Sequence, residues 1–267
     1  MKFNKVITHD TTFHADDVFA VAMLGMVNPD FRLIRTRDPE ILKAGQNDPH
    51  TVVLDVGGIY DPAMLNFDHH QDVNLMSAAG LIYQHFQNDI CPKKIAQLYF
   101  AEFINAIDMI DTNRDNIYGT WDILPTGFRN ASSIISGFNR DVTDAGSQDA
   151  RFGQALIFAT VIIDNEIFAA QAKAAFETDY AQRDILPNNV AVFNTFFRNW
   201  KDKKDHVFAV MPHANGWQIQ SRDTTIAKVP EWIEQCPGFI FRHGSGFMAV
   251  VKEKDVAVTF ALTLTSF

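Results

Sequence analysis

Four of the nine histidines stand next to carboxylates in the first 70 residues of the chain. The first cluster runs from His9 to Asp17, and the second is Asp68-His69-His70. Between them lies Asp55, at the end of an apolar run, and a later helical stretch carries Asp108 and Asp111. Imidazoles and carboxylates that converge from separate elements are the ligands of dinuclear transition-metal sites. The pattern therefore predicts a two-metal hydrolytic centre.

The expected metal ligands are His9, His14, Asp16, Asp55, His69 and one of Asp108 and Asp111. Asp55 follows the central strand, from which one carboxylate could bridge two ions about 3.5–4 Å apart. The mixture of imidazole and carboxylate favours two Mn²⁺ ions, with Mg²⁺ as the alternative.

Each of these residues also has an ordinary interpretation. An acid at a strand end such as Asp55 more often caps a turn, and His14 alone would be an unremarkable core or surface histidine. Asp108 and Asp111 alone would form one face of a solvated helix. The occurrence of all the clusters together favours a functional site.

The elements that position these residues alternate between strand and helix. Short runs rich in β-branched residues end just before His9, Thr36 and Gly57. Helical patterns separate them, at residues 16–26 and from about residue 38. This alternation predicts a parallel α/β sheet. Ligands of open α/β proteins bind at the carboxyl ends of the strands, where the clusters fall.

The rest of the chain divides at Leu186-Pro187-Asn188-Asn189. Before this turn we expect helices over residues 77–111 and 155–181, with loops and one short helix over 112–150. After it come five short strand patterns. The sequence thus predicts two domains: an α/β catalytic domain at 1–186 and a smaller α/β domain at 187–267.

Composition limits the partners. The 267 residues carry a formal net charge of −9, which disfavours wrapping of duplex DNA. No apolar run approaches the roughly 20 residues of a membrane span, so no membrane partner is expected. Cys91 and Cys236 form no CxxC pair. The chain reaches His9 and Asp10 before an apolar signal-peptide core could form, so export is not expected. A cytoplasmic location is the expectation, and a homodimer is left open.

Several motifs resemble the melanocyte-proliferating-gene-one family of metal-dependent hydrolases, which is related to the DHH phosphoesterase superfamily. The densest matches are Thr12-Phe13-His14-Ala15-Asp16, Val53-Leu54-Asp55-Val56-Gly57-Gly58 and Phe67-Asp68-His69-His70-Gln71. Arg35-Thr36-Arg37-Asp38, Ala78–Tyr83 and Phe241–Phe247 extend the resemblance over nearly the whole chain. It implies a DHH-like first domain and the metal ligands named above.

The resemblance also points to residues outside the metal ligands. His70 is expected to act as a general acid or to contact phosphate, with Asp68 and Arg37 as further catalytic residues. His243-Gly244-Ser245-Gly246 is similar to a glycine-rich substrate loop, although an ordinary turn between strands would have the same composition. Arg35 and Arg37 suit a substrate phosphate and a surface acid equally well.

The expected activity is hydrolysis of phosphodiester bonds by water activated between two metals. The resemblance implies a 3′–5′ exonuclease acting on short RNA or a small nucleotide. The alternatives are a small-nucleotide phosphatase or pyrophosphatase, and a metal-stabilised binding protein without turnover.

Overall fold

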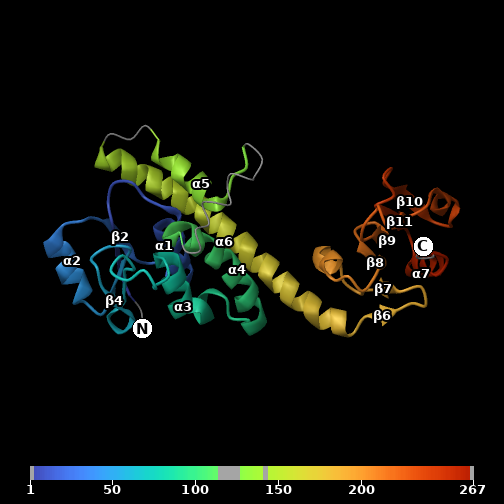
Figure 1. Ribbon diagram of the computed structural model, residues 1–267, viewed down its shortest axis with the longest axis horizontal. Helices are drawn as coiled ribbons and strands as arrows, with labels where there is room; N and C mark the ends of the chain where they lie inside the picture. The colour runs from blue at the N-terminus through green and yellow to red at the C-terminus, as the bar shows by residue number, and fades with distance from the viewer. Residues whose placement is uncertain (1–2, 114–126, 141–143, 265–267) are drawn as a thin grey trace. The chain divides into compact units, whose positions relative to one another are not determined.

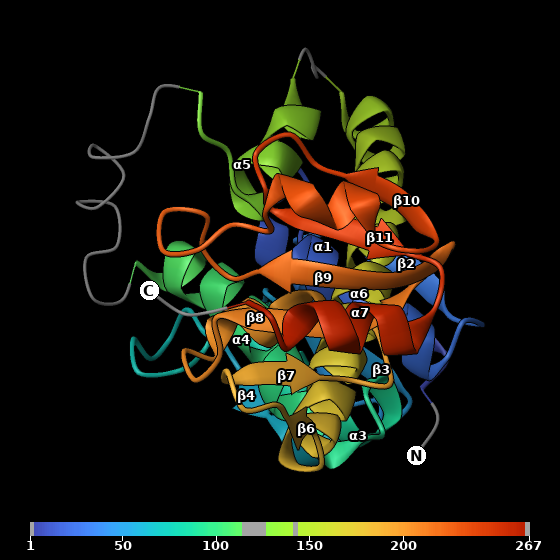
Figure 2. The ribbon, with the colours of Figure 1, turned by 90° about the vertical axis from the view of Figure 1, so that its right-hand side faces the viewer.

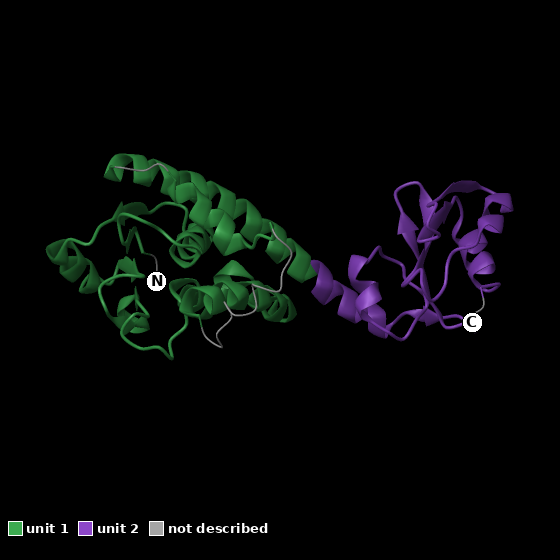
Figure 3. Cartoon of the chain, turned by 45° about the horizontal axis from the view of Figure 1, so that its top comes forward, with its two compact units in different colours: residues 1–171 green, residues 172–267 purple. Residues whose placement is uncertain are grey.

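The computed structural model describes residues 3–113, 127–140 and 144–264 (Figure 1). The chain divides into two compact units, residues 1–171 and 172–267 (Figure 3). The division falls within helix α6 (Ala145–Ala181), upstream of the turn at 186–189 where the sequence placed it. The reason is packing: Phe176, near the end of α6, lies in a buried cluster with Phe193 and Phe197 of the second unit.

The first unit contains a five-stranded sheet in the order β2-β1-β3-β5-β4. Its strands are β1 (Lys5–Thr8), β2 (Arg32–Arg35), β3 (Thr51–Leu54), β4 (Tyr60–Asp61) and β5 (Asn66–Phe67). All neighbours are parallel except β4, which runs antiparallel to β5. The predicted parallel sheet is confirmed.

The described helices between β1 and α6 are α1 (Ala15–Val27), α2 (Pro39–Gln46), α3 (Ala78–Ile90), α4 (Lys94–Thr112) and α5 (Ala131–Ser136), with 3₁₀ turns η1 (Pro62–Met64) and η3 (Gly137–Asn139). These helices pack on the sheet or on one another, and α4 and α5 both contact α1. Leu42 of α2 packs on Ile7 and Val53, so α2 lies on one face of the sheet. Because strand side chains alternate between faces, Val6 and Val52 are buried on the other face.

The strand order places two strand ends at a topological switch point. From β1 the chain passes through α1 to β2, and α2 then returns it to β3 on the opposite side of β1. The carboxyl ends of β1 and β3 therefore meet where the connections diverge in opposite directions, which is where ligands of open α/β sheets bind.

The second unit contains a six-stranded sheet in the order β10-β11-β9-β8-β7-β6, parallel only between β7 and β8. Its elements are β6 (Asp184–Ile185), β7 (Val190–Val192), η4 (Arg198–Asp202), β8 (Phe208–His213), β9 (Gly216–Ser221), η5 (Glu231–Gln235), β10 (Phe239–Arg242), β11 (Met248–Val251) and α7 (Lys254–Ala261). Figure 2 shows α7 lying along the sheet, and its Phe260 shares a core with Val210 and Ile219. The five expected strands are present. The sequence did not reveal β6, which has two residues, or α7, whose three β-branched residues favour a strand.

Within the described residues, α6 alone has the length and apolar composition of a membrane-crossing helix. The sequence analysis did not single it out. Only 28% of its most apolar window is buried, and exposed apolar residues such as Phe168 account for part of that composition. One such helix is weak evidence for a membrane span, since helices of soluble proteins pass the same test.

Candidate metal centre

Three parallel strands deliver the histidine and aspartate clusters to one edge of the first sheet. His9 follows β1, Asp55 follows β3, and Asp68 begins the segment after β5. Asp55 adopts a left-handed backbone conformation, with φ of 56°, and the turn continues through Gly57 and Gly58, also at positive φ. A left-handed conformation costs an ordinary residue roughly 1–2 kcal/mol. The chain therefore bends sharply at the acid that was expected to bridge two ions.

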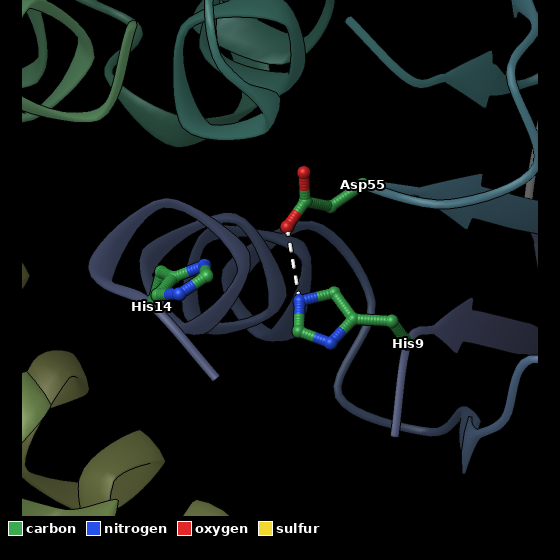
Figure 4. A group of neighbouring side chains, drawn as sticks. All are labelled: His9, His14 and Asp55. Carbon is green, nitrogen blue, oxygen red and sulfur yellow. Dashed lines mark ion pairs between the residues drawn. The ribbon is translucent and has the colours of Figure 1, made fainter. Parts of the chain in front are cut away.

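Asp55 lies between two histidines from different segments. Its Oδ2 is 3.2 Å from His9 Nε2 (Figure 4), and its Oδ1 is 3.2 Å from His69 Nε2. Burial alone would raise the pKa of Asp55, but the hydrogen bonds from His69 and His9 outweigh it and lower the pKa. An ionised carboxylate with its two oxygens turned to different imidazoles is suited to bridging two cations.

The orientation of His9 is set by its other ring nitrogen. Nδ1 lies 2.9 Å from the carbonyl oxygen of Asp10 and donates to it, since a carbonyl can only accept. Nε2 therefore faces the carboxylates, at 3.4 Å from Asp17 Oδ2 as well as beside Asp55. Burial lowers the pKa of His9, yet these acids raise it overall. A cation would take the place of the Nε2 proton.

The remaining candidate ligands surround the same point. His69 Nε2 is 3.5 Å from Asp111 Oδ2 and 3.8 Å from Asp16 Oδ2. Potential metal-ligand atoms, the histidine nitrogens and carboxylate oxygens, lie within 4.8 Å of one another in four groups. The groups are His9, His14 and Asp55; Asp55, His69 and His70; His14, Asp16 and Asp111; and Asp16, Asp17 and Asp55. The structure thus brings together His9, His14, Asp16, Asp55, His69 and Asp111, as the sequence predicted.

The hydrogen bonding of the buried carboxylate oxygens tests whether this cluster suits a cation. Asp16 Oδ1 accepts no hydrogen bond from the described residues, and Asp55 Oδ1 and Asp17 Oδ2 face only imidazole nitrogens, those of His69 at 3.2 Å and His9 at 3.4 Å. Burial, followed by the charge of Asp55, raises the pKa of Asp16 well above its usual range. Crowded buried carboxylates with unpartnered oxygens are what divalent cations neutralise, so the donor set fits metal binding.

Asp17 was missed by the sequence analysis. It is fully buried, and burial raises its pKa to about 7. Its Oδ1 accepts a hydrogen bond of 2.9 Å from the backbone N–H of His14, the residue that caps α1. The available signal was its position in the first helical turn after His14, where an acid reaches back to the cap.

The two acids of α4 have different surroundings. Asp111 joins the candidate ligands, whereas Asp108 Oδ1 accepts a 2.5 Å hydrogen bond from the buried backbone N–H of Ser77. Asp108 is 2% exposed and stands in none of the four groups. Asp108 fixes the start of α3 instead.

His70 and Asp68 form a pair beside the cluster. The side chain of His70 is 63% exposed, and its Nδ1 is 2.6 Å from Asp68 Oδ1. Asp68 also accepts hydrogen bonds from the backbone N–H groups of His70 and Gly58. Asp68 therefore orients His70 and holds the Gly58 turn, which makes it a positioning residue. His70 remains accessible to a substrate.

The two arginines separate the alternatives that the sequence left open. Arg35 donates to Asp149 at 2.8 Å, and its guanidinium stacks on Phe13 and Phe152 with 3% of the side chain exposed. These contacts favour pairing with an acid over substrate binding. Arg37 donates to Asp10 and stays half exposed, at the rim of the same loop.

His243-Gly244-Ser245-Gly246 lies in the second unit, in the hairpin between β10 and β11. His243 Nδ1 accepts from the hydroxyl of Ser245 at 2.7 Å and from its backbone N–H at 3.2 Å. Gly246 has φ of 74°, and a Cβ there would come within 2.9 Å of Lys228. The loop is an ordered, exposed turn that requires its last glycine.

Residues 5–221 match the family model MYG1_exonuc, described as uncharacterised protein family UPF0160. A MYG1 protein of Chlamydia pneumoniae is 30% identical over 285 residues, covering 93% of this chain and 92% of the relative. The bovine MYG1 exonuclease is 32% identical over 145 residues, which are 44% of this chain and 36% of that protein. The fission yeast MYG1 protein is 37% identical over 152 residues, 49% of this chain and 45% of that protein. The chain thus spans less than half the length of these two eukaryotic relatives.

Two solved structures are similar over most of the chain at low identity. A pGpG-specific phosphodiesterase from Vibrio cholerae, PggH, covers 97% of both chains with a TM-score of 0.35 and 12% identity. RecJ from Thermus thermophilus, solved with Mn²⁺, covers 96% of this chain and 51% of its own, with a TM-score of 0.26 and 11% identity.

Proposed function

The chain belongs to the MYG1_exonuc family, and we propose that it is a metal-dependent phosphodiesterase with 3′–5′ exonuclease activity on short RNA. The observation that carries this proposal is the position of Asp55, whose two oxygens lie 3.2 Å from histidines of two different segments. The word exonuclease in the names of the mammalian relatives supports cleavage of a nucleic acid from its end, and the choice of short RNA is what the sequence resemblance implies.

The proposed ligands divide around Asp55. His9 and His14 lie on one side, and His69 lies on the other, next to Asp111. Asp16 borders both groups. The donors suit two Mn²⁺ ions, which when bound would polarise the phosphate and lower the pKa of a coordinated water.

The residues of this chain supply orientation and a proton. Asp10 holds the ring of His9 through its carbonyl, so that Nε2 presents a lone pair to the cation site. Asp68 orients His70 in the same manner, at 2.6 Å from Nδ1. With its Nδ1 proton directed to Asp68 in the protonated ring, exposed His70 can give its Nε2 proton to a leaving oxygen.

The experiment is a substrate screen of manganese-loaded protein. Short 5′-labelled RNAs, dinucleotides, adenosine bisphosphate and pyrophosphate are compared, with Asp55→Asn as the inactive control. We expect stepwise release of mononucleotides from the 3′ end of RNA. Hydrolysis of the bisphosphate or pyrophosphate alone would replace the exonuclease by a phosphatase or pyrophosphatase. A metal-loaded protein inert towards all four would indicate a binding protein.

A further inference from the structure

An open cavity of about 500 Å³ adjoins the metal centre within the first unit. His14 and Asp111, two of the candidate ligands, line it on one side. Among the described residues that line its other parts are Phe128, Arg129 and the serines of α5. Mostly apolar cavities with a few polar side chains are typical binding sites for small organic molecules. This one begins where the metal centre ends.

Two hydrogen bonds attach η3, which directly follows the cavity-lining helix α5, to the loop that carries His14. The side-chain Oδ1 of Asn139 accepts from the backbone N–H of Phe13 at 3.1 Å, and its Nδ2 donates to the carbonyl of Phe13 at 2.7 Å. Phe13 directly precedes His14, and Ile135 anchors α5 in the core with no exposed surface. The wall and the ligand therefore keep a fixed spacing, although 126 residues separate Phe13 from Asn139.

The side chains of the wall suit one class of ligand. Phe128 is 54% exposed as a residue, and exposed aromatic side chains stack with nucleobases. Arg129 donates through one nitrogen to the carbonyl of Phe128, and it forms no ion pair with any residue that the structure describes. Its planar guanidinium retains further N–H groups that match phosphate oxygens in pairs. Ser132 and Ser136 add hydroxyls that can bond a sugar.

We propose that this cavity binds the nucleotide next to the scissile phosphate, with its base against Phe128 and its own phosphate on Arg129. The inference rests on the proposed function, because the scissile phosphate is assigned to the metal centre. It adds how that substrate is recognised: through a base on Phe128 and a second phosphate on Arg129, besides the scissile phosphate.

The test compares two substrates on manganese-loaded wild type, Arg129→Ala and Phe128→Ala. One is a 5′-phosphorylated dinucleotide, and the other is bis(p-nitrophenyl) phosphate, which has neither a sugar nor a second phosphate. Arg129→Ala should raise KM for the dinucleotide at least tenfold and leave the synthetic diester and bound metal within twofold. Phe128→Ala should raise KM for the dinucleotide less. Arg32→Ala is the matched control, because Arg32 is an exposed arginine at the amino end of β2, whereas the candidate metal centre lies at the carboxyl ends of the strands.

The outcomes separate the two proposals. An unchanged KM for the dinucleotide in Arg129→Ala would overturn the nucleotide site and leave the phosphodiesterase standing. Equal losses on both substrates would also overturn it, since Arg129 would then act on the metal centre. If wild type hydrolyses neither substrate, the phosphodiesterase fails, and titration with adenosine monophosphate still tests the cavity. Tenfold weaker binding by Arg129→Ala supports it, and equal binding overturns it.

Discussion

The two units differ in charge far more than the whole chain suggests. Residues 172–267 hold 11 of the 23 lysines and arginines but only 10 of the 32 acids, so the first unit carries the whole negative excess. In the first unit, Asp16, Asp17 and Asp55 are buried together. In the second, an open cavity of about 610 Å³ is lined by Lys201, Lys204, Arg222 and one acid, Asp223, beside Ser245 of the glycine loop.

The difference shows why net charge was a poor guide to partners. Buried carboxylates attract cations, while an exposed glycine turn beside lysines is suited to anions. Lys201 lies 3.8 Å from the centre of the Phe247 ring, which keeps a positive charge at this cavity. A charge of −9 disfavours wrapping of duplex DNA, and it does not exclude phosphate binding by the second unit. Variants at the buried acids of the first unit should change metal content, and variants in the glycine loop of the second unit should change only substrate affinity.

The largest effect is expected at the centre of the first unit. Asp55→Asn should remove most bound metal and reduce activity by roughly a thousandfold or more, because one bridging group serves both ions. Asp16→Asn should lose less metal than Asp55→Asn. Elemental analysis after manganese loading measures both, with the exposed Asp30→Asn as control. Retention of metal by Asp55→Asn would remove the bridging role.

The next largest effect separates the acids of α4. Asp111→Ala should lower activity about a hundredfold with little change in stability, as expected when a ligand is removed. Asp108→Ala should instead destabilise the fold by about 1–3 kcal/mol, because the buried N–H of Ser77 loses its acceptor. Denaturant unfolding and activity assays distinguish them, and Asp108→Asn should restore stability. A larger activity loss at Asp108 would reverse the assignment.

The sequence was sufficient for the sheet and for most of the side chains that gather at the candidate metal centre. Each ligand cluster directly follows a strand, and parallel strands place their carboxyl ends together, so convergence of His9, Asp55 and His69 followed from local patterns. Asp111 and Asp108 could not be separated in this way, since positions three apart share a helix face. Only the packing of α4 on α3 decides which of them meets Ser77.

The residues that sequence reasoning missed depend on long-range contacts. Asn139 hydrogen-bonds the backbone of Phe13, 126 residues away, and no local sequence pattern predicts such a contact for an asparagine. Arg129 and Phe128 had no neighbouring signal at all. The role of Arg35 was undecidable for the same reason: its acid, Asp149, lies 114 residues away. Motifs reveal chemistry that is local, while pockets arise from tertiary structure.

The second unit should affect substrate binding alone. Because Nδ1 of His243 accepts both bonds from Ser245, the proton lies on Nε2, which can donate to a phosphate. His243→Ala should raise KM about ten- to a hundredfold, the range of one or two charge-assisted hydrogen bonds. Metal content should stay unchanged. His213→Ala, in the β8–β9 turn, is the matched control. Full activity in His243→Ala would exclude the loop from substrate binding.

The smallest effect is a difference in pH dependence between the units without metal. Burial and neighbouring acids raise the pKa of Asp17 from 3.8 to about 7, and the acids raise that of His9 above 6.5. The folded first unit therefore binds more protons than the unfolded chain. Its stability falls as pH rises from about 4 to 7, where Asp17 loses its proton, and falls further above pH 6.5 through His9. In the second unit, burial lowers the pKa of His206, whose Nε2 accepts from Arg183 at 2.7 Å. Its folded state binds fewer protons, so stability falls as pH drops below 6.5. Each proton contributes at most about 1.4 kcal/mol per pH unit.

Amide exchange of residues 5–27 reports the first unit, and that of residues 206–221 reports the second, in chelator-treated protein between pH 5.5 and 8.5. Manganese should remove the decline in the first unit only; parallel pH profiles in both units would contradict the division of charge between them.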